Sequence, residues 1–163
     1  MNISVVLSTY NGAKYIIDQM ESLKSQSRAA DEVLIFDDCS TDGTVDKVEA
    51  FIERNKLYNW RLNKNKDNLG FRKNFMQGIA KCNGELVFLC DQDDVWMPDK
   101  IKLMAEAVEN NDNIDVLACS YTSWYTDGTK KVTSLIGGGG GRTLKRLFTQ
   151  IISYRCHRDA LMD

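Results

Sequence analysis

The first 110 residues alternate between short apolar runs and longer stretches in which apolar residues recur three or four positions apart. Short, largely apolar runs bounded by polar residues predict buried strands, here at residues 3–8, 32–36, 60–62 and 86–90. The stretches between them predict amphipathic helices, which in this order imply an α/β fold with a mainly parallel sheet flanked by helices. The predicted helix faces are Ile16, Met20 and Leu23, then Val45, Val48, Phe51 and Ile52, then Phe71, Phe75 and Ile79.

The pattern weakens beyond residue 111. Residues 116–121 resemble a strand, and the Asp-Gly pair within residues 125–129 is typical of a hairpin turn. Five consecutive glycines at 137–141 predict a mobile loop, because the Gly-Lys-Ser/Thr ending of a phosphate-binding loop is missing. A short final helix is predicted from Leu144, Leu147, Phe148 and Ile151.

The strongest chemical signal is the acidic sequence Asp91-Gln92-Asp93-Asp94, which directly follows the apolar run at 86–90. Alternation along an extended segment places Asp91 and Asp93 on one face and Gln92 on the other. Carboxylates this close together repel one another unless a cation lies between them. Two hard oxygen ligands suit Mg²⁺ or Mn²⁺, so the acidic sequence is a candidate metal site. The alternative interpretation is a solvent-exposed acidic loop without a ligand.

A fourth helix is predicted after the acidic sequence. Pro98 suits the first helical position, where no amide hydrogen is needed. The acidic sequence therefore lies in a strand-to-helix turn, where open α/β sheets bind their ligands. The apolar face of this helix is Ile101, Met104, Ala105 and Val108.

Two further polar clusters follow predicted strands, Thr9-Tyr10-Asn11 after the first and Asp37-Asp38 after the second. The carboxyl ends of parallel strands meet at one edge of the sheet, so all three clusters are expected to lie together there. Each cluster also has a local explanation: Asn11 or Asp42 caps a helix, and Asp38 fixes a turn. Ser40, Thr41, Asp42 and Thr44 suit the start of the second helix.

Composition limits the function without naming it. The 163 residues fit one domain, and a net charge of −2 with dispersed Lys and Arg argues against nucleic-acid binding. No run approaches the ~20 apolar residues that cross a bilayer, and no leader segment is visible, which predicts a cytoplasmic protein.

The cysteines and histidine argue against two kinds of site. Five cysteines without a C-x-x-C pair, and a single histidine, disfavour structural zinc. Cys156 and His157 are a weak nucleophile–base pair, because adjacent side chains seldom point at one another.

In this order, the polar clusters resemble the inverting nucleotide-sugar glycosyltransferases of family 2, which have the Rossmann-like GT-A fold. The resemblance covers roughly residues 2–110 and is nearest to the bacterial rhamnosyltransferase-like subgroup. It implies that residues 1–163 form one nucleotide-sugar-binding domain for bacterial polysaccharide or cell-surface glycan synthesis. The segments that carry it are residues 4–12 and 37–44, Asn68-Leu69-Gly70-Phe71 with Lys73-Asn74-Phe75, and residues 91–96.

The resemblance implies a role for each cluster. Asp91 would hold the ribose, and Asp93 would bind Mn²⁺ or Mg²⁺, which bridges the two phosphates. Asp38 would hydrogen-bond the pyrimidine edge, and Lys73 lies where the family often has a basic residue near the donor. The residues that would line the base pocket are Ser8, Thr9 and Tyr10.

The resemblance also implies partners. The donor would be a UDP- or dTDP-linked sugar, and the acceptor a glycan or a lipid-linked hydroxyl. Such an acceptor is compatible with peripheral association at the inner face of the membrane.

The C-terminal part departs from the family pattern. An inverting transferase needs a carboxylate that deprotonates the acceptor, and the only late carboxylates are Asp159 and Asp163, outside the usual setting. Residues 150–157 also differ from the expected Gly-Cys-rich segment. We therefore expect a truncated or diverged transferase, for which the alternative is a donor-binding module without transfer activity. Truncation would leave core surface uncovered and promote self-association.

A second alternative is an aspartyl-phosphate phosphatase, in which Asp91 is the nucleophile and Asp93 the general acid. That class needs a downstream Ser/Thr, a Lys and an acidic pair, and only 69 residues follow Asp94. It also leaves Asp37 and Asp38 unexplained. A calcium loop and a dinucleotide-binding fold are disfavoured, because Lys102 occupies the twelfth loop position and G-x-G-x-x-G is absent.

Overall fold

The computed structural model describes residues 1–124, 129–133 and 152–155. The strands and helices predicted up to residue 110 are all present. The strands are β1 (Ile3–Thr9), β2 (Glu32–Asp37), β3 (Trp60–Lys64), β4 (Leu86–Asp91), β5 (Val116–Ala118), β6 (Tyr121–Trp124), β7 (Lys130–Thr133) and β8 (Ile152–Arg155). The helices are α1 (Ile16–Lys24), α2 (Thr44–Asn55), α3 (Phe71–Lys81) and α4 (Lys100–Glu109).

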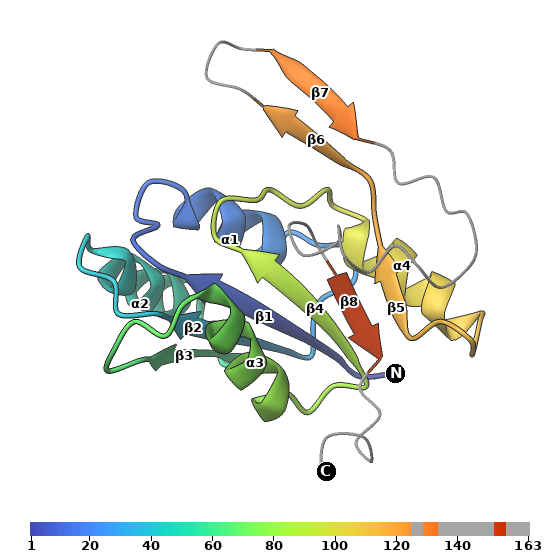
Figure 1. Ribbon diagram of the computed structural model, residues 1–163, viewed down its shortest axis with the longest axis horizontal. Helices are drawn as coiled ribbons and strands as arrows, with labels where there is room; N and C mark the ends of the chain where they lie inside the picture. Colours follow the sequence, from blue (N-terminus) through green and yellow to red (C-terminus); the bar gives the residue numbers. More distant parts are fainter. Residues whose placement is uncertain (125–128, 134–151, 156–163) are drawn as a thin grey trace.

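The central sheet has the strand order β3-β2-β1-β4-β8-β5 (Figure 1). The first four strands of this order are parallel, and Val5 of β1 lies between Val33 of β2 and Phe88 of β4. β8 pairs antiparallel with both β4 and β5. The predicted α/β fold with a mainly parallel sheet is confirmed.

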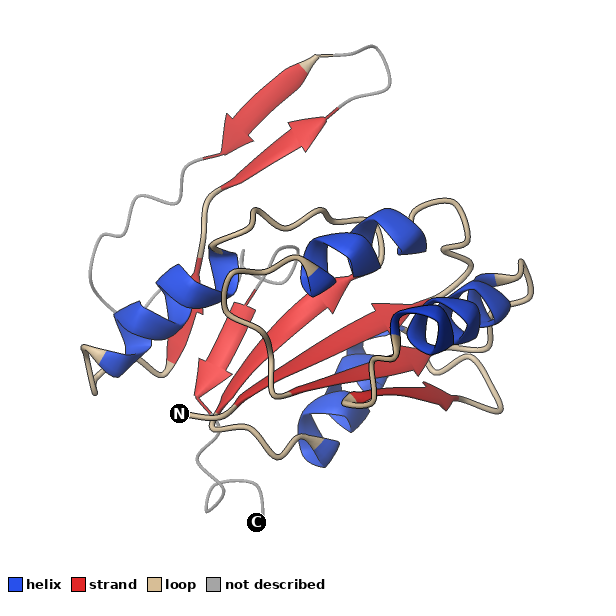
Figure 2. Ribbon diagram, turned by 180° about the vertical axis from the view of Figure 1, so that it is seen from behind, coloured by secondary structure: helices blue, strands red, loops and turns tan. Residues whose placement is uncertain are grey.

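Helices cover both faces of the sheet, so alternate residues of each strand enter different cores. Ile3, Val5 and Leu7 pack toward α1, α2 and α4, whereas Val6 packs with Phe36 toward α3. Figure 1 shows α3 in front of the sheet and α1, α2 and α4 behind it, and Figure 2 shows the same arrangement from the opposite side. Burial on both faces explains why β1, β2 and β4 are largely continuous apolar runs.

Two helix predictions need correction. The apolar face assigned to α3 is only partly right, because Phe71 is 55% exposed while Asn74 and Gly78 are buried. A Cβ atom on Gly78 would lie 2.2 Å from Val6 Cγ1, so a small residue is needed at this close contact. α4 begins at Lys100 rather than Pro98, because the Pro98 carbonyl accepts the Ser27 N–H at 2.8 Å and residues 98 and 99 form a turn.

The C-terminal part is less regular than predicted. The strand expected at 116–121 ends at Ala118, and the hairpin expected around residues 125–129 is confirmed by the antiparallel pairing of β6 with β7. β8 was not predicted. The Asp-Gly turn, the glycine run, the predicted final helix, Cys156, His157, Asp159 and Asp163 lie outside the described residues. In the described part of the chain, no helix has the length and apolar character needed to cross a membrane.

Candidate functional site

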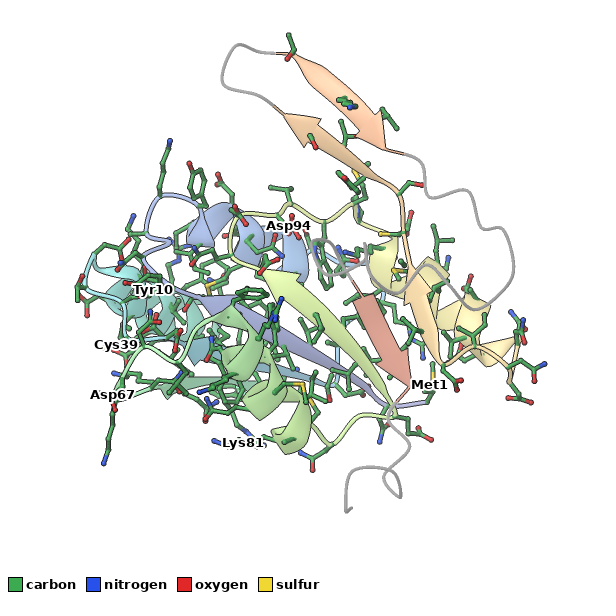
Figure 3. The ribbon with its side chains drawn as sticks, viewed as in Figure 1. Met1, Tyr10, Cys39, Asp67, Lys81 and Asp94 are labelled. Carbon is green, nitrogen blue, oxygen red and sulfur yellow. The ribbon has the colours of Figure 1, made fainter. Side chains whose placement is uncertain are left out.

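The three polar clusters meet at the carboxyl edge of the parallel sheet, as predicted. In register, Thr9 is beside Asp37 and Ser8 is beside Asp91. Figure 3 shows Tyr10 and Cys39 at the side of the molecule opposite Met1.

Of the three residues expected in the base pocket, Tyr10 is exposed and the other two are buried. Ser8 Oγ accepts a hydrogen bond from Asn74 Nδ2 at 2.8 Å. Thr9 Oγ1 donates to Asp37 Oδ1 at 2.8 Å. Tyr10 has 49% of its surface exposed, so it offers an aromatic face at the site. Direct contact of Ser8 or Thr9 with a nucleotide stays a prediction.

Asp38 is buried and holds the loop that leads into α3. Its carboxylate accepts the Leu69 and Gly70 N–H groups, both at 2.8 Å, and Asn65 Nδ2 at 2.9 Å. Asn65 Nδ2 also donates to Asn74 Oδ1 at 2.8 Å, which links Asp38 through Asn74 to the end of β1. The local explanation, in which Asp38 fixes a turn, therefore applies, and a hydrogen bond to a pyrimidine stays a prediction.

The loops after β1 and β2 are bonded to each other. The Asn11 N–H donates to Ser40 Oγ at 2.9 Å, and Asn11 Oδ1 accepts the Thr41 N–H at 2.9 Å. Asp42 accepts the N–H groups of Ala13 at 2.9 Å and Thr44 at 3.0 Å. Burial would raise the pKa of Asp42, but these hydrogen bonds and one from the Thr44 hydroxyl lower it below its usual value. These bonds give the exposed Tyr10 a rigid support.

Gln92, which the sequence placed on the face opposite Asp91, binds Tyr10, the residue that follows β1. Its Oε1 accepts the Tyr10 N–H at 2.8 Å, and its Nε2 donates to the Tyr10 carbonyl at 2.9 Å. A Cβ atom on Gly12 would lie 2.1 Å from Gln92 Oε1, so Gly12 leaves the room that this side chain needs. Gln92 thereby fixes the acidic loop against the loop that carries Tyr10.

The carboxylates of the acidic loop interact unfavourably with one another. Desolvation, followed by the negative charges of Asp94 and Asp93, raises the pKa of Asp91 to about 6. Desolvation is also the main cause that raises the pKa of Asp94. An excess of negative charge of this kind fits a bound cation.

The end of the acidic loop is anchored by two polar side chains that the sequence pattern did not reveal, Ser22 of α1 and Gln26, which follows this helix. Ser22 Oγ accepts the Trp96 N–H at 3.0 Å. Gln26 accepts the Ile101 N–H at 3.0 Å and donates to the Met97 carbonyl at 2.8 Å. The only signal in the sequence is the place of Ser22 beside the apolar face of α1, and nothing marks Gln26, which lies beyond the end of this helix.

Lys73 lies on the first turn of α3 and is exposed. Gly70, which precedes this helix, has a φ of +82°, a conformation that favours glycine. A contact between Lys73 and a donor stays a prediction.

Comparison with known proteins gives a consistent result. The family model described as Glycosyl transferase family 2 matches residues 4–163. Poly(ribitol-phosphate) beta-N-acetylglucosaminyltransferase TarS of Staphylococcus aureus is 33% identical over 119 residues, which are 72% of this chain and 20% of that protein. An uncharacterised glycosyltransferase of Nostoc sp. is 33% identical over 121 residues, which are 72% of this chain and 36% of that protein.

Solved structures agree with this fold. The crystal structure of S. aureus TarS 1–349 in complex with UDP is 34% identical with a TM-score of 0.64, covering 73% of this chain and 35% of that one. A mannosyltransferase from Pyrobaculum calidifontis in complex with GDP-Man and Mn²⁺ is 23% identical with a TM-score of 0.67, covering 72% and 35%, and shows the fold alone. The matched part of this chain thus covers between 20% and 36% of the length of these relatives.

Proposed function

Because this chain belongs to glycosyl transferase family 2, we propose that it forms the donor-binding part of an enzyme that transfers a sugar from a nucleoside diphosphate to a hydroxyl acceptor, with inversion. The observation that carries the proposal is the acidic loop beside the exposed ring of Tyr10, at the carboxyl edge of the sheet. In open α/β sheets ligands bind at this edge. Family membership argues against the aspartyl-phosphate phosphatase alternative.

Asp93 is the proposed ligand of Mn²⁺ or Mg²⁺. Among the described residues no three acidic, Cys or His side chains form a metal-binding group. The protein would therefore supply one or two carboxylate ligands. Oxygen atoms of the diphosphate and of water would supply the remaining ligands, because hard cations bind such oxygen atoms. When bound, the cation stabilises the negative charge of the departing nucleoside diphosphate.

The other side chains would bind and orient the donor. The exposed ring of Tyr10 would stack on the nucleotide base, and the carboxylate of Asp91 would accept hydrogen bonds from the ribose. Asp38, with its three hydrogen bonds to the protein, would shape the pocket by holding Leu69 and Gly70 in place. Lys73 would lie near the diphosphate.

The setting follows from the relatives. TarS is named as a poly(ribitol-phosphate) beta-N-acetylglucosaminyltransferase, and a structure of TarS 1–349 contains UDP-GlcNAc. A relative of Bacillus subtilis is named as a teichuronic acid biosynthesis glycosyltransferase. We infer a UDP- or dTDP-linked donor and a cell-surface glycan or lipid-linked acceptor, handled at the cytoplasmic face of the membrane. The rhamnosyltransferase-like subgroup stays a prediction.

Calorimetric titration of UDP and dTDP, each with and without Mn²⁺, tests the donor site. Mn²⁺-dependent binding is expected in the unmodified chain and in Asp67→Asn, which removes an exposed carboxylate distant in sequence from the acidic loop. Asp93→Asn is expected to lose it. Equal binding in Asp93→Asn and Asp67→Asn would overturn the metal assignment.

A transfer assay with labelled UDP-sugar then separates the enzyme from the donor-binding module. Mn²⁺-dependent binding together with transfer supports an enzyme. Binding without transfer supports the module, and absence of nucleotide binding in the unmodified chain overturns both.

A further inference from the structure

The Lys and Arg residues of this chain are less dispersed than predicted. Residues 60–81 contain six of them and one Asp, a net charge of +5, whereas the whole chain has a net charge of −2. The rest of the chain is therefore acidic, with a net charge of −7. All six cationic residues of this stretch are exposed. Such a separation of charge favours an anionic partner at the basic part of the surface.

The fold places most of this positive charge on one side of the sheet. α3 carries three cationic residues and no acidic one, and the loop before it adds a fourth cation. Figure 1 shows α3 on the face of the sheet opposite to α1, α2 and α4. Lys64 is set apart, because its ammonium group pairs with Glu49 of α2 at 2.6 Å. The four remaining residues on this side, which we call the basic face, are Lys66, Arg72, Lys73 and Lys81.

A pocket within the basic face has room for an anionic group. Its volume is about 350 Å³, and its lining comes from the end of β3, the loop after it and α3, including Lys66, Gln77 and Lys81. The Nε2 atom of Gln77 is buried and has no hydrogen-bond partner among the described residues. Because buried amide N–H groups rarely lack an acceptor, this group is suited to donate to an oxygen atom of a bound anion. Cations outnumber the single carboxylate of the lining, that of Asp67.

Apolar side chains accompany the cations of the basic face. Phe71 and Met76 of α3 are both more than half exposed. A surface helix with cationic and large apolar side chains is typical of proteins that lie on membranes, where the cations meet anionic headgroups and the apolar groups enter the interface. A single-stranded nucleic acid would use the same cations, but its bases stack on aromatic rings and gain little from Met76. The combination therefore favours a membrane.

We propose that the basic face, together with Phe71 and Met76, docks this domain on a membrane rich in anionic phospholipids, with a headgroup phosphate in the pocket at Lys66 and Lys81. The choice of a membrane rests on the proposed function, because its lipid-linked acceptor would lie there. Asp38 holds the loop that leads into α3, so docking through α3 would bring the donor site close to such an acceptor.

Co-sedimentation with lipid vesicles tests the proposal. The unmodified chain should bind vesicles that contain phosphatidylglycerol and phosphatidylcholine but not vesicles of phosphatidylcholine alone, and added salt should weaken this binding. Each cation near an anionic surface strengthens binding about fivefold, so the double variant Lys66→Gln with Lys81→Gln should bind about 25-fold more weakly. The matched control is Lys56→Gln with Lys102→Gln, which removes two exposed lysines at the end of α2 and on α4. This control makes the same change of net charge on the other side of the sheet and should change the affinity little.

Two outcomes of the vesicle assay would overturn the proposal. The first is that the unmodified chain does not bind anionic vesicles. The second is an equal loss of binding in the two double variants, which would show a response to net charge rather than to one face. Met76→Ser and Leu103→Ser, at similarly exposed positions of α3 and α4, test the apolar contact. Only Met76→Ser should weaken vesicle binding, and equal effects would contradict docking through α3.

Two further measurements separate the membrane from other ligands of the same lysines. A single-stranded oligonucleotide that binds more tightly than anionic vesicles, and is released by Lys66→Gln with Lys81→Gln, would overturn the choice of a membrane. The affinity for UDP with Mn²⁺, measured without vesicles, should be the same in this variant and in the unmodified chain. A loss of UDP affinity would place the two lysines in the donor site and overturn the proposal. If the unmodified chain binds anionic vesicles but not UDP, the proposed function fails and the docking face is supported.

Discussion

The carboxamide of Gln92 makes two hydrogen bonds to the backbone of Tyr10, at 2.8 and 2.9 Å. The two residues are 82 positions apart in the sequence and belong to loops that follow adjacent strands. This pair sets the distance between an aromatic side chain and a cluster of carboxylates. A sugar-nucleotide donor that contacts both the aromatic ring and the carboxylates therefore depends on the Gln92–Tyr10 pair.

Gln92→Leu should weaken nucleotide binding, because leucine has a similar size and makes neither hydrogen bond. The pair lies near the surface, so its loss should cost about 0.5–1.5 kcal/mol of stability per hydrogen bond at most. We expect a Kd for UDP with Mn²⁺ at least tenfold higher, measured by calorimetry, with a small change in melting temperature. An unchanged Kd would show that the two loops keep their arrangement without this pair.

The metal-free protein should lose stability as the pH rises from about 4 to about 6. The pKa of Asp91 is raised from 3.8 to about 6, so the folded chain holds a proton in this range that the unfolded chain has released. Below this range, the protonated carboxyl group of Asp91 makes its full contribution to the free energy of unfolding. Thermal melts between pH 4 and 8 should show a flatter profile for Asp91→Asn than for the control Asp67→Asn. Parallel profiles would contradict the raised pKa.

Asp38→Asn should destabilise the fold by about 1–3 kcal/mol, because one oxygen that accepts hydrogen bonds becomes an amide donor facing other donors. Asp67→Asn, an exposed position in the same stretch of chain as Leu69 and Gly70, is the control. Denaturant unfolding measures both. If Asp38→Asn kept full stability and lost only UDP affinity, Asp38 would be a nucleotide contact rather than a support.

Gly78→Ala should cost about 1–3 kcal/mol, because the added methyl group overlaps the side chain of Val6. Met76→Ala, at a 57% exposed position of the same helix, should change the free energy of unfolding by no more than about 0.5 kcal/mol. Chemical denaturation of both variants gives the comparison. Equal stability of the two would mean that α3 shifts away from the sheet at little cost.

The parallel part of the fold is predictable largely because β1, β2 and β4 are buried on both faces. Such strands appear as continuous apolar runs, and helices between them force the parallel order. The meeting of Thr9, Asp37 and Asp91 at one edge follows from that order alone. These predictions depend on local pattern and topology, which the sequence contains.

Other features depend on partners that are distant in sequence. Ser22 on α1 and Gln26 just after it look like exposed polar positions until the loop at residues 96–101 is placed against them. Asn74 and Gly78 are buried although Phe71 is exposed, because α3 approaches the sheet too closely for large side chains. Helical periodicity gives the face of a helix but not the distance of its contact.

The pairing of β8 with both β4 and β5 has a consequence for the order of folding during synthesis. In the sheet, β8 lies between β4 and β5. Residues 116–118 of β5 therefore join the sheet only through β8, which leaves the ribosome more than thirty residues later. Until then one edge of β4 has no partner among the described strands and is open to pairing with another chain. Nascent chains paused before residue 152 should therefore be the form of this protein most prone to aggregate and most dependent on chaperones.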